Sequence, residues 1–82
     1  MTKEEVYAQV AKILTDYLRL EEGEVKPESH VVTDLGGDSL ALVELGFKFM
    51  EAFGIGMIKP DDKNLVVGNL VEWIVAQKEG RD

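Results

Sequence analysis

One serine stands in a setting that could do chemistry. Ser39 comes directly after two glycines and Asp38, at the point where a helical pattern begins. Asp38 occupies an N-cap position, where its side-chain oxygen can accept a bond from the N–H groups of the next turn. Ser39 then takes the first helical position, where N–H groups lack partners and the helix dipole is positive. Because helix N-termini favour anions, a phosphate on Ser39 would be tolerated.

The same residues also support a hydrolytic role. The run Gly37-Asp38-Ser39-Leu40 resembles the nucleophile motif of the GDSL esterases and lipases. A serine hydrolase needs a base within reach of the serine, a carboxylate that orients the base, and an oxyanion hole. The only histidine of the sequence, His30, lies nine positions earlier in an aperiodic stretch, and no strand pattern precedes the motif. We therefore interpret His30 as a solvated loop residue and keep the hydrolase as a distant alternative.

The composition limits the possible functions. The 82 residues suffice for one small domain, residues 1–82, with a thin core and little room for a large substrate site. Sixteen acidic and nine basic residues give a net charge of −7, which argues against nucleic acid and favours partners with basic patches. Without cysteine the chain has no thiol, disulfide or thiolate metal site, and we predict no metal centre.

The sequence also bears on localisation. No apolar run approaches the length of a membrane span. The first residues, Met1-Thr2-Lys3-Glu4-Glu5, do not have the pattern of a signal peptide. The expected location is therefore the cytoplasm.

The pattern predicts an all-α fold, a bundle of three longer helices and one short one. Apolar residues at helical spacing place these helices at about 3–18, 39–53, 61–65 and 67–77. Thr2 and Glu5 form a capping-box pattern before the first helix, and Gly54 is a stop signal after the second. Pro60 suits the first turn of the short helix. We expect the tail, 78–82, to be frayed.

A long connection separates the first two helices. The run Glu21-Glu22-Gly23 is expected to end the first helix, and Pro27 discourages helix beyond it. Such long loops in compact domains are usually functional or disordered. Apolar anchors are spread along this one: Val25, Val31, Val32 and Leu35. We therefore predict that the loop is ordered and packed along its length.

The second helix carries two apolar stripes. The stripe expected to face the core consists of Leu42, Leu45, Gly46, Phe49 and Phe53. The other stripe consists of Leu40, Val43, Phe47 and Met50. The remaining, polar face consists of Ala41, Glu44, Lys48 and Glu51. A domain this small needs one stripe for its core, so we expect the other to contact a partner, with burial against the next helix as the alternative for Val43 and Phe47.

Several runs of residues occur in the order found in one known family. They are Asp34-Leu35-Gly36-Gly37-Asp38-Ser39-Leu40, Val43-Glu44-Leu45, Phe53-Gly54-Ile55 and Val67-Gly68-Asn69-Leu70-Val71-Glu72-Trp73-Ile74. Over about residues 3–76 the chain thus resembles an acyl carrier protein. The resemblance implies that Ser39, supported by Asp38, carries 4'-phosphopantetheine, attached from coenzyme A by a phosphopantetheinyl transferase. The thiol of that arm would hold acyl groups, so the protein would be a carrier and not an enzyme.

The resemblance further implies a docking face and an acyl pocket. Acyl transferases and ketosynthases with basic patches would dock on Leu40, Val43, Glu44, Phe47, Met50 and Glu51. The acyl pocket, between the second, third and fourth helices, would be lined by Leu45, Phe49, Met57, Leu65 and Leu70. Because Phe49 and Leu70 are bulkier than expected there, we predict a narrowed pocket.

We therefore predict a freestanding, monomeric acyl carrier protein that works with dissociated synthase enzymes. The pathway would be fatty-acid synthesis or a specialised lipid or polyketide pathway. Four residues differ from the acidic or small residues of many fatty-acid carriers and favour the specialised role: Ala41, Lys48, Met50 and Ala52. A peptidyl or aminoacyl carrier is the nearest alternative, against which Glu44 and Glu51 count. A helical adaptor whose Ser39 is never modified is a further one.

Overall fold

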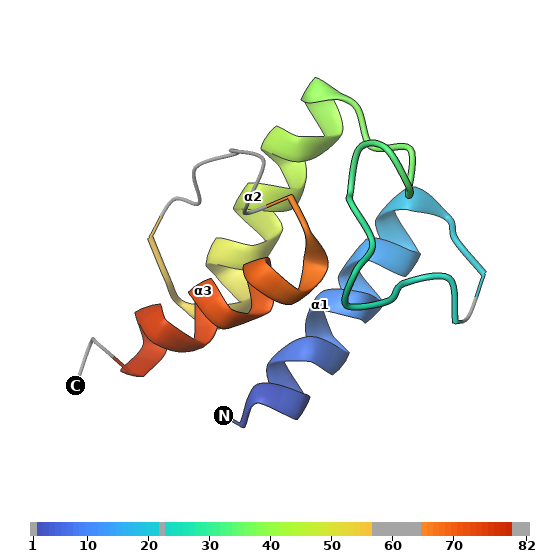
Figure 1. Cartoon of the computed structure of the whole chain (residues 1–82). Coiled ribbons are helices and arrows are strands. Elements are labelled where there is room, and N and C mark those ends of the chain that lie inside the picture. The colour runs from blue at the N-terminus through green and yellow to red at the C-terminus, as the bar shows by residue number, and fades with distance from the viewer. Residues whose placement is uncertain (1, 22, 57–64, 80–82) are drawn as a thin grey trace.

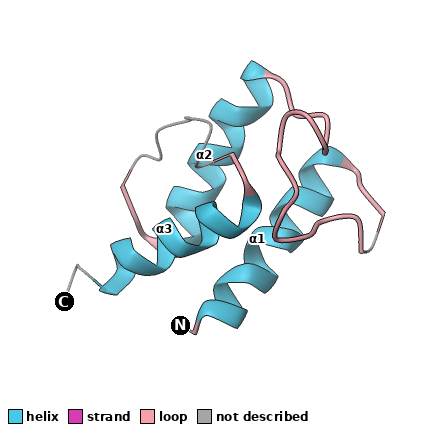
Figure 2. Ribbon diagram, viewed as in Figure 1, coloured by secondary structure: helices cyan, strands magenta, loops and turns pink. Residues whose placement is uncertain are grey.

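The computed structural model describes residues 2–21, 23–56 and 65–79. These form three helices, α1 (Lys3–Leu18), α2 (Ser39–Phe53) and α3 (Val67–Glu79). α1 packs against both α2 and α3 (Figure 1). The described part of the chain consists of helices joined by loops, which confirms the all-α class (Figure 2). The short helix predicted near 61–65 lies outside the described residues except for Leu65, which is in a turn.

α1 begins as the capping-box pattern predicts. The Thr2 hydroxyl accepts a bond from the Glu5 N–H at 3.2 Å, and the Glu5 carboxylate accepts one from the Thr2 N–H at 2.9 Å. The helix runs to Leu18, which is the end of the predicted range of about 3–18. It is closed by Arg19, which adopts the left-handed conformation (φ 55°) and turns its N–H back to the Thr15 carbonyl.

The capping box predicts an acid sensitivity that can be measured. The hydrogen bonds with Thr2 hold the pKa of the Glu5 carboxyl below its ordinary value. A lowered folded-state pKa means that this contribution to stability is present above the unfolded pKa and is lost as pH falls through the folded one. We expect Glu5→Gln to lower the melting temperature at neutral pH, and this deficit to shrink as the buffer is acidified. A deficit independent of pH would contradict the capping-box account.

α2 begins and ends where the sequence predicts. The Asp38 carboxylate accepts a bond from the Ala41 N–H at 2.8 Å, which makes it the N-cap. Gly54 closes the helix in the left-handed conformation (φ 64°), and its N–H donates to the Met50 carbonyl. The bonds that define both boundaries join residues three or four positions apart, so local signals were enough to predict them.

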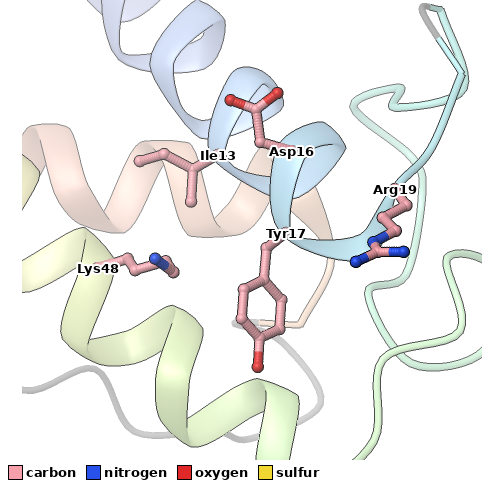
Figure 3. Close-up of a pocket in the computed structure, with 5 residues that line it drawn as sticks. All are labelled: Ile13, Asp16, Tyr17, Arg19 and Lys48. Atoms are coloured by element: carbon pink, nitrogen blue, oxygen red, sulfur yellow. The ribbon is translucent and has the colours of Figure 1, made fainter.

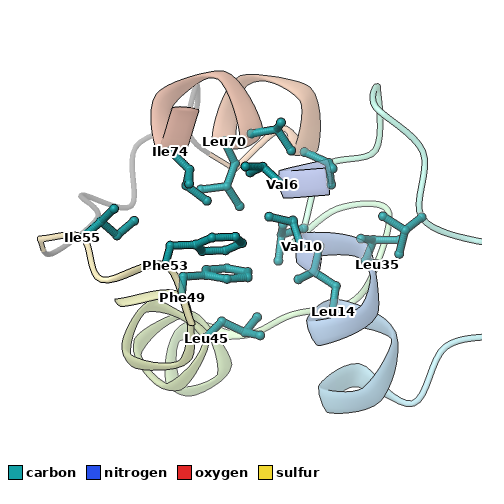
Figure 4. Close-up of a cluster of buried hydrophobic side chains, with 14 residues drawn as sticks. Val6, Val10, Leu14, Leu35, Leu45, Phe49, Phe53, Ile55, Leu70 and Ile74 are labelled. Carbon is teal, nitrogen blue, oxygen red and sulfur yellow. The ribbon is translucent and has the colours of Figure 1, made fainter. Parts of the chain in front are cut away.

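The core lies between the three helices and the loop that joins α1 to α2 (Figure 4). α1 contributes Val6, Val10 and Leu14, and α3 contributes Val67, Leu70, Val71 and Ile74. From α2 the buried residues are Ala41, Leu45, Phe49 and Phe53. Within this core the rings of Phe49 and Phe53 pack with their centroids 6.4 Å apart.

Two assignments on the core-facing side of α2 need correction. Ala41 was placed on the polar face, but only 7% of it is exposed. Leu42 and Gly46 were placed on the core face, but they are only half-buried. The buried ridge runs through residues spaced four apart, starting at Ala41, and therefore winds around the helix instead of following a straight stripe.

The loop between α1 and α2 is ordered, as predicted. Val25, Val31 and Leu35 are buried, while Val32 is half-buried. The loop is fastened to the start of α3 by backbone hydrogen bonds that join Pro27 to Gly68, Ser29 to Val67, and Val31 to Leu65, over 2.8 to 2.9 Å. These bonds hold the residues before Ser39 against a helix far away in sequence.

α3 extends beyond its predicted end. It runs to Glu79, two residues past the predicted end near Gln77. The Lys78 ammonium group donates to the Phe53 carbonyl at 2.9 Å, which ties the last turn of α3 to the end of α2. A cation in the last turn also interacts favourably with the helix dipole. Residues 80–82 of the predicted tail lie outside the described part of the chain.

Candidate functional site

Ser39 is the first residue of α2 and is exposed. The start of α2 projects at an outer end of the molecule (Figure 1). The Asp38 carbonyl accepts the Leu42 N–H at 3.0 Å, and its carboxylate accepts the Ala41 N–H. Hydrogen bonds therefore fix the N-cap and the first turn of α2. The serine is exposed to solvent beside the positive end of the helix dipole.

Two glycines shape the approach to this serine. Gly36 has a φ of 78°, a conformation that residues with a side chain rarely adopt. Gly37 lies so close to Val31 that an added Cβ would stand 3.1 Å from the Val31 carbonyl oxygen. Its N–H donates to that same oxygen at 2.9 Å. The two glycines thus allow the loop to turn tightly and leave no side chain of their own beside Ser39.

The two serines of the sequence have opposite environments. Ser29 is buried, and its hydroxyl accepts a bond from the Lys26 N–H at 3.1 Å. Ser39 is exposed at the helix start. Burial therefore separates a structural serine from one that an enzyme could reach.

His30 has a structural position that the sequence did not indicate. It was interpreted as a solvated loop residue, but it is half-buried. Its Nδ1 accepts bonds from the Val32 and Thr33 N–H groups, both at 3.1 Å, and the Asp34 carboxylate accepts the His30 N–H at 2.8 Å. An imidazole that accepts bonds in this way caps the turn before Leu35, as a serine or aspartate caps a helix.

The second apolar stripe of α2 faces solvent. Leu40, Val43 and Phe47 are 67%, 57% and 51% exposed. Val43 and Phe47 are thus not core residues, and the partner contact predicted for them stays a prediction. Met50, at the far end of the stripe, is half-buried. Three large, exposed apolar side chains at helical spacing beside an accessible serine form a surface suited to binding a partner protein. We call Leu40, Val43 and Phe47 the apolar stripe.

The acidic side chains that flank the apolar stripe differ in their contacts. Glu51 is exposed. The Glu44 carboxylate instead accepts a hydrogen bond from the Tyr17 hydroxyl of α1. This bond, followed by desolvation and the negative charges of Glu44 and Asp38, raises the pKa of the Tyr17 hydroxyl. The contact joins residues 27 positions apart, so no local pattern could have revealed it.

A surface pocket of about 340 Å³ lies beside this contact (Figure 3). Its lining residues come from the end of α1 and from α2: Ile13, Asp16, Tyr17, Arg19 and Lys48. The Lys48 ammonium group stands 5.7 Å from the centre of the Tyr17 ring, within the range of a cation–π interaction. Tyr17 therefore contacts both a negative and a positive side chain of α2.

The residues predicted to line an acyl pocket have mixed positions. Leu45, Phe49 and Leu70 belong to the buried core, and Leu65 is half-buried. Met57 lies outside the described residues. The three core residues come from α2 and α3, as the predicted pocket requires.

Comparison with known proteins decides the family. Residues 8–74 match the family model described as "Phosphopantetheine attachment site". The chain is similar to the acyl carrier protein of Prochlorococcus marinus (strain MIT 9515), with 41% identity over 81 residues that cover 95% of this chain and 99% of that protein. The chain belongs to the acyl carrier protein family. It is also similar to the acyl carrier protein of Thermotoga maritima, with 36% identity over 77 residues covering 89% of this chain and 91% of the relative.

Membership of the acyl carrier protein family makes the chain a carrier and not a catalyst, with a site for phosphopantetheine. Ser39 provides what a phosphodiester linkage needs, because its hydroxyl is exposed and the start of α2 favours an anion. Among the described residues, no three acidic, histidine or cysteine side chains gather to hold a metal ion. None of the helices in this part of the acyl carrier is long and apolar enough to cross a membrane.

Proposed function

We propose that this acyl carrier holds its 4'-phosphopantetheine arm on Ser39 and delivers acyl intermediates to separate synthase enzymes. The observation that carries the proposal is the exposure of Ser39 at the first position of α2, in contrast to the buried Ser29. The arm supplies a thiol on which acyl groups are held as thioesters. This fits a sequence without cysteine, in which the reactive sulfur comes with the cofactor.

The residues around Ser39 would hold the arm rather than react with its cargo. Asp38 fixes the first turn of α2 through its bond to the Ala41 N–H. The N–H groups of that turn and the helix dipole favour the negative charge of a phosphodiester. Gly36 and Gly37 keep the approach free of side chains. The site thus presents the arm to solvent, where successive enzymes can reach it.

We propose that the phosphopantetheinyl transferase and later the acyl transferases and ketosynthases dock on α2. Leu40 follows Ser39 directly, so an enzyme that reaches the serine must approach the apolar stripe. Met50 and Glu51 would extend this contact toward the end of the helix. With a net charge of −7, the carrier is expected to attract enzymes with basic docking faces and to lose this attraction as salt rises.

The attachment is tested by incubating the protein with coenzyme A and a broad-specificity phosphopantetheinyl transferase. Intact mass is expected to increase by one phosphopantetheine, and fragmentation is expected to place the added mass on the peptide that contains Ser39. A folded protein whose mass does not change would favour the unmodified adaptor. Ester hydrolysis that survives purification and disappears in His30→Ala would favour the hydrolase.

The apolar stripe predicts a loss of docking without a loss of stability. Phe47→Ala removes an aromatic side chain that is half exposed, so we expect little change in the melting temperature. The kcat/KM of the transferase is expected to fall about tenfold, since aromatic anchors dominate the energy of such interfaces. Steady-state kinetics on the two proteins tests this. Equal kinetics would place the docking surface elsewhere.

The pathway is proposed from the residues that flank the apolar stripe. We place this carrier in a fatty-acid pathway or in a specialised lipid or polyketide pathway, and we favour the specialised pathway because Lys48 lowers the negative charge of α2. We expect the carrier to be a cytoplasmic monomer. The buried Ala41 does not bear on docking. A comparison of ketosynthases from fatty-acid and polyketide systems on the same acylated carrier tests the choice. Loading by aminoacyl-activating enzymes alone would instead support the peptidyl carrier.

A further inference from the structure

We propose that Tyr17 tunes which enzymes this carrier accepts, by holding the Glu44 carboxylate against α1 and away from the docking face of α2. Enzymes would then dock on the apolar stripe with little charge contact to Glu44. The inference rests on the proposed function, because it concerns enzymes that dock beside Ser39.

The first support is the hydrogen bond between α1 and α2. The Tyr17 hydroxyl donates to the Glu44 carboxylate, so one oxygen of that carboxylate is already engaged within the molecule. Tyr17 projects from the end of α1 toward α2, across the pocket that separates the two helices (Figure 3). Glu44 comes between Leu40 and Lys48 at helical spacing, so it sits at the α1-facing border of the apolar stripe.

The second support is the charge around this contact. Lys48 follows Glu44 by four residues and lies over the Tyr17 ring, so a positive charge accompanies the engaged carboxylate. Arg19 lines the same pocket. An approaching basic residue would meet these cations and would share with Tyr17 a carboxylate that already accepts one bond. Glu51, one turn beyond Lys48, is exposed and is the acid of α2 that remains free to steer an enzyme.

If Glu44 is engaged by Tyr17, an enzyme would recognise this carrier less through charge pairs and more through apolar contacts with α2. Rim charges mainly raise the association rate and its dependence on salt, whereas buried apolar anchors slow dissociation. With Glu44 engaged, α2 would offer three exposed apolar side chains and a single steering acid. The partner that fits this surface is an enzyme whose docking face has an apolar cleft for the stripe and places its basic residues opposite Glu51 and not opposite Glu44.

The test removes one hydroxyl group. Tyr17→Phe keeps the ring beside Lys48 and deletes the donor to Glu44. With a phosphopantetheinyl transferase that has a basic docking face, we expect the second-order rate of modification to rise roughly two- to fivefold at low ionic strength. The gain should disappear at high salt, where exposed charges are screened. An unchanged or lower rate at low salt would overturn the inference.

Two further variants assign the effect to Glu44. In Tyr17→Phe/Glu44→Gln the gain should vanish, whereas in the matched control Tyr17→Phe/Glu51→Gln it should persist. The reverse pattern would overturn the inference.

A separate experiment follows the pKa of the Tyr17 hydroxyl by alkaline titration. In Glu44→Gln this pKa should fall back toward its ordinary value, a measurement that needs no enzyme and no Tyr17 variant. No such movement would mean that the contact is absent in solution, and it would likewise overturn the inference.

The proposed function and this inference fail in different ways. If no variant is modified at Ser39, the proposed attachment is wrong and the inference falls with it. If every variant is modified at one common rate with one common salt dependence, the attachment stands and only the role of Tyr17 is overturned. Helical circular dichroism and melting curves on each variant show that the compared proteins are folded.

Discussion

Ser39→Ala is expected to abolish addition of phosphopantetheine while leaving the domain folded. The hydroxyl is exposed at the first position of α2, and the cap of the helix is supplied by Asp38, so its removal costs little stability. No other exposed serine is present, since Ser29 is buried and bonded to the Lys26 N–H. Intact mass after incubation with coenzyme A and transferase is the measurement, and we expect a complete loss of the mass increase.

Two controls sharpen this prediction. Ser29→Ala removes the other serine, and we expect full modification of the fraction that folds, with reduced stability because the Lys26 N–H loses its partner. Asp38→Ala weakens the cap but keeps the acceptor hydroxyl, so modification should be slowed and not abolished. If the Ser39→Ala protein still gained the mass of phosphopantetheine, the attachment would have to be on another residue, and the assignment of the site to Ser39 would be wrong.

Phe49→Ala is expected to have the largest effect on stability. Phe49 is only 3% exposed, and its ring packs against Phe53 and within the core shared with α1 and α3. Truncation of a buried phenylalanine costs about 3–5 kcal/mol. Small domains have a total stability of only about 5–15 kcal/mol, so this variant should be partly or wholly unfolded at room temperature. Urea denaturation followed by circular dichroism measures the loss.

Phe47 provides the matched comparison for Phe49. It lies two positions earlier in the same helix, and 51% of it is exposed. The same change to alanine should therefore leave the free energy of unfolding nearly unchanged and act on transferase kinetics instead. Equal destabilisation by the two variants would contradict the division of α2 into a core face and a docking face.

Local signals in the sequence account for the ends of α2. Asp38 as cap and Gly54 as left-handed stop form their capping bonds with nearby residues, and their types alone favour these roles. The exposed position of Ser39 follows from the same local pattern. The apolar stripe was also predictable, because the spacing of apolar residues defines it and the small size of the domain leaves it without a partner inside the chain.

Features that depend on an unusual residue type in a local role, or on a contact between distant residues, were not predictable. The end of α1 was predicted, but the left-handed conformation of Arg19 that closes it was not, because arginine rarely adopts it. The capping role of His30 replaces the usual serine or aspartate with an imidazole, and the bond from Tyr17 to Glu44 joins two helices. Ala41 was misplaced because alanine is compatible with either face of a helix, and only the tertiary structure shows that it is buried.

The fastening of the long loop to α3 has a consequence for how the carrier matures. The loop that precedes Ser39 is held because the Gly68 and Val67 N–H groups donate to the Pro27 and Ser29 carbonyls, and the Val31 N–H donates to the Leu65 carbonyl. Residues 65–68 are synthesised well after Ser39. A nascent or truncated chain without that region has the acceptor serine but lacks the support that orients it. A transferase that recognises the folded surface around Ser39 would then modify incomplete chains poorly. The phosphopantetheine arm would therefore be added mainly to molecules in which the loop has already paired with the start of α3.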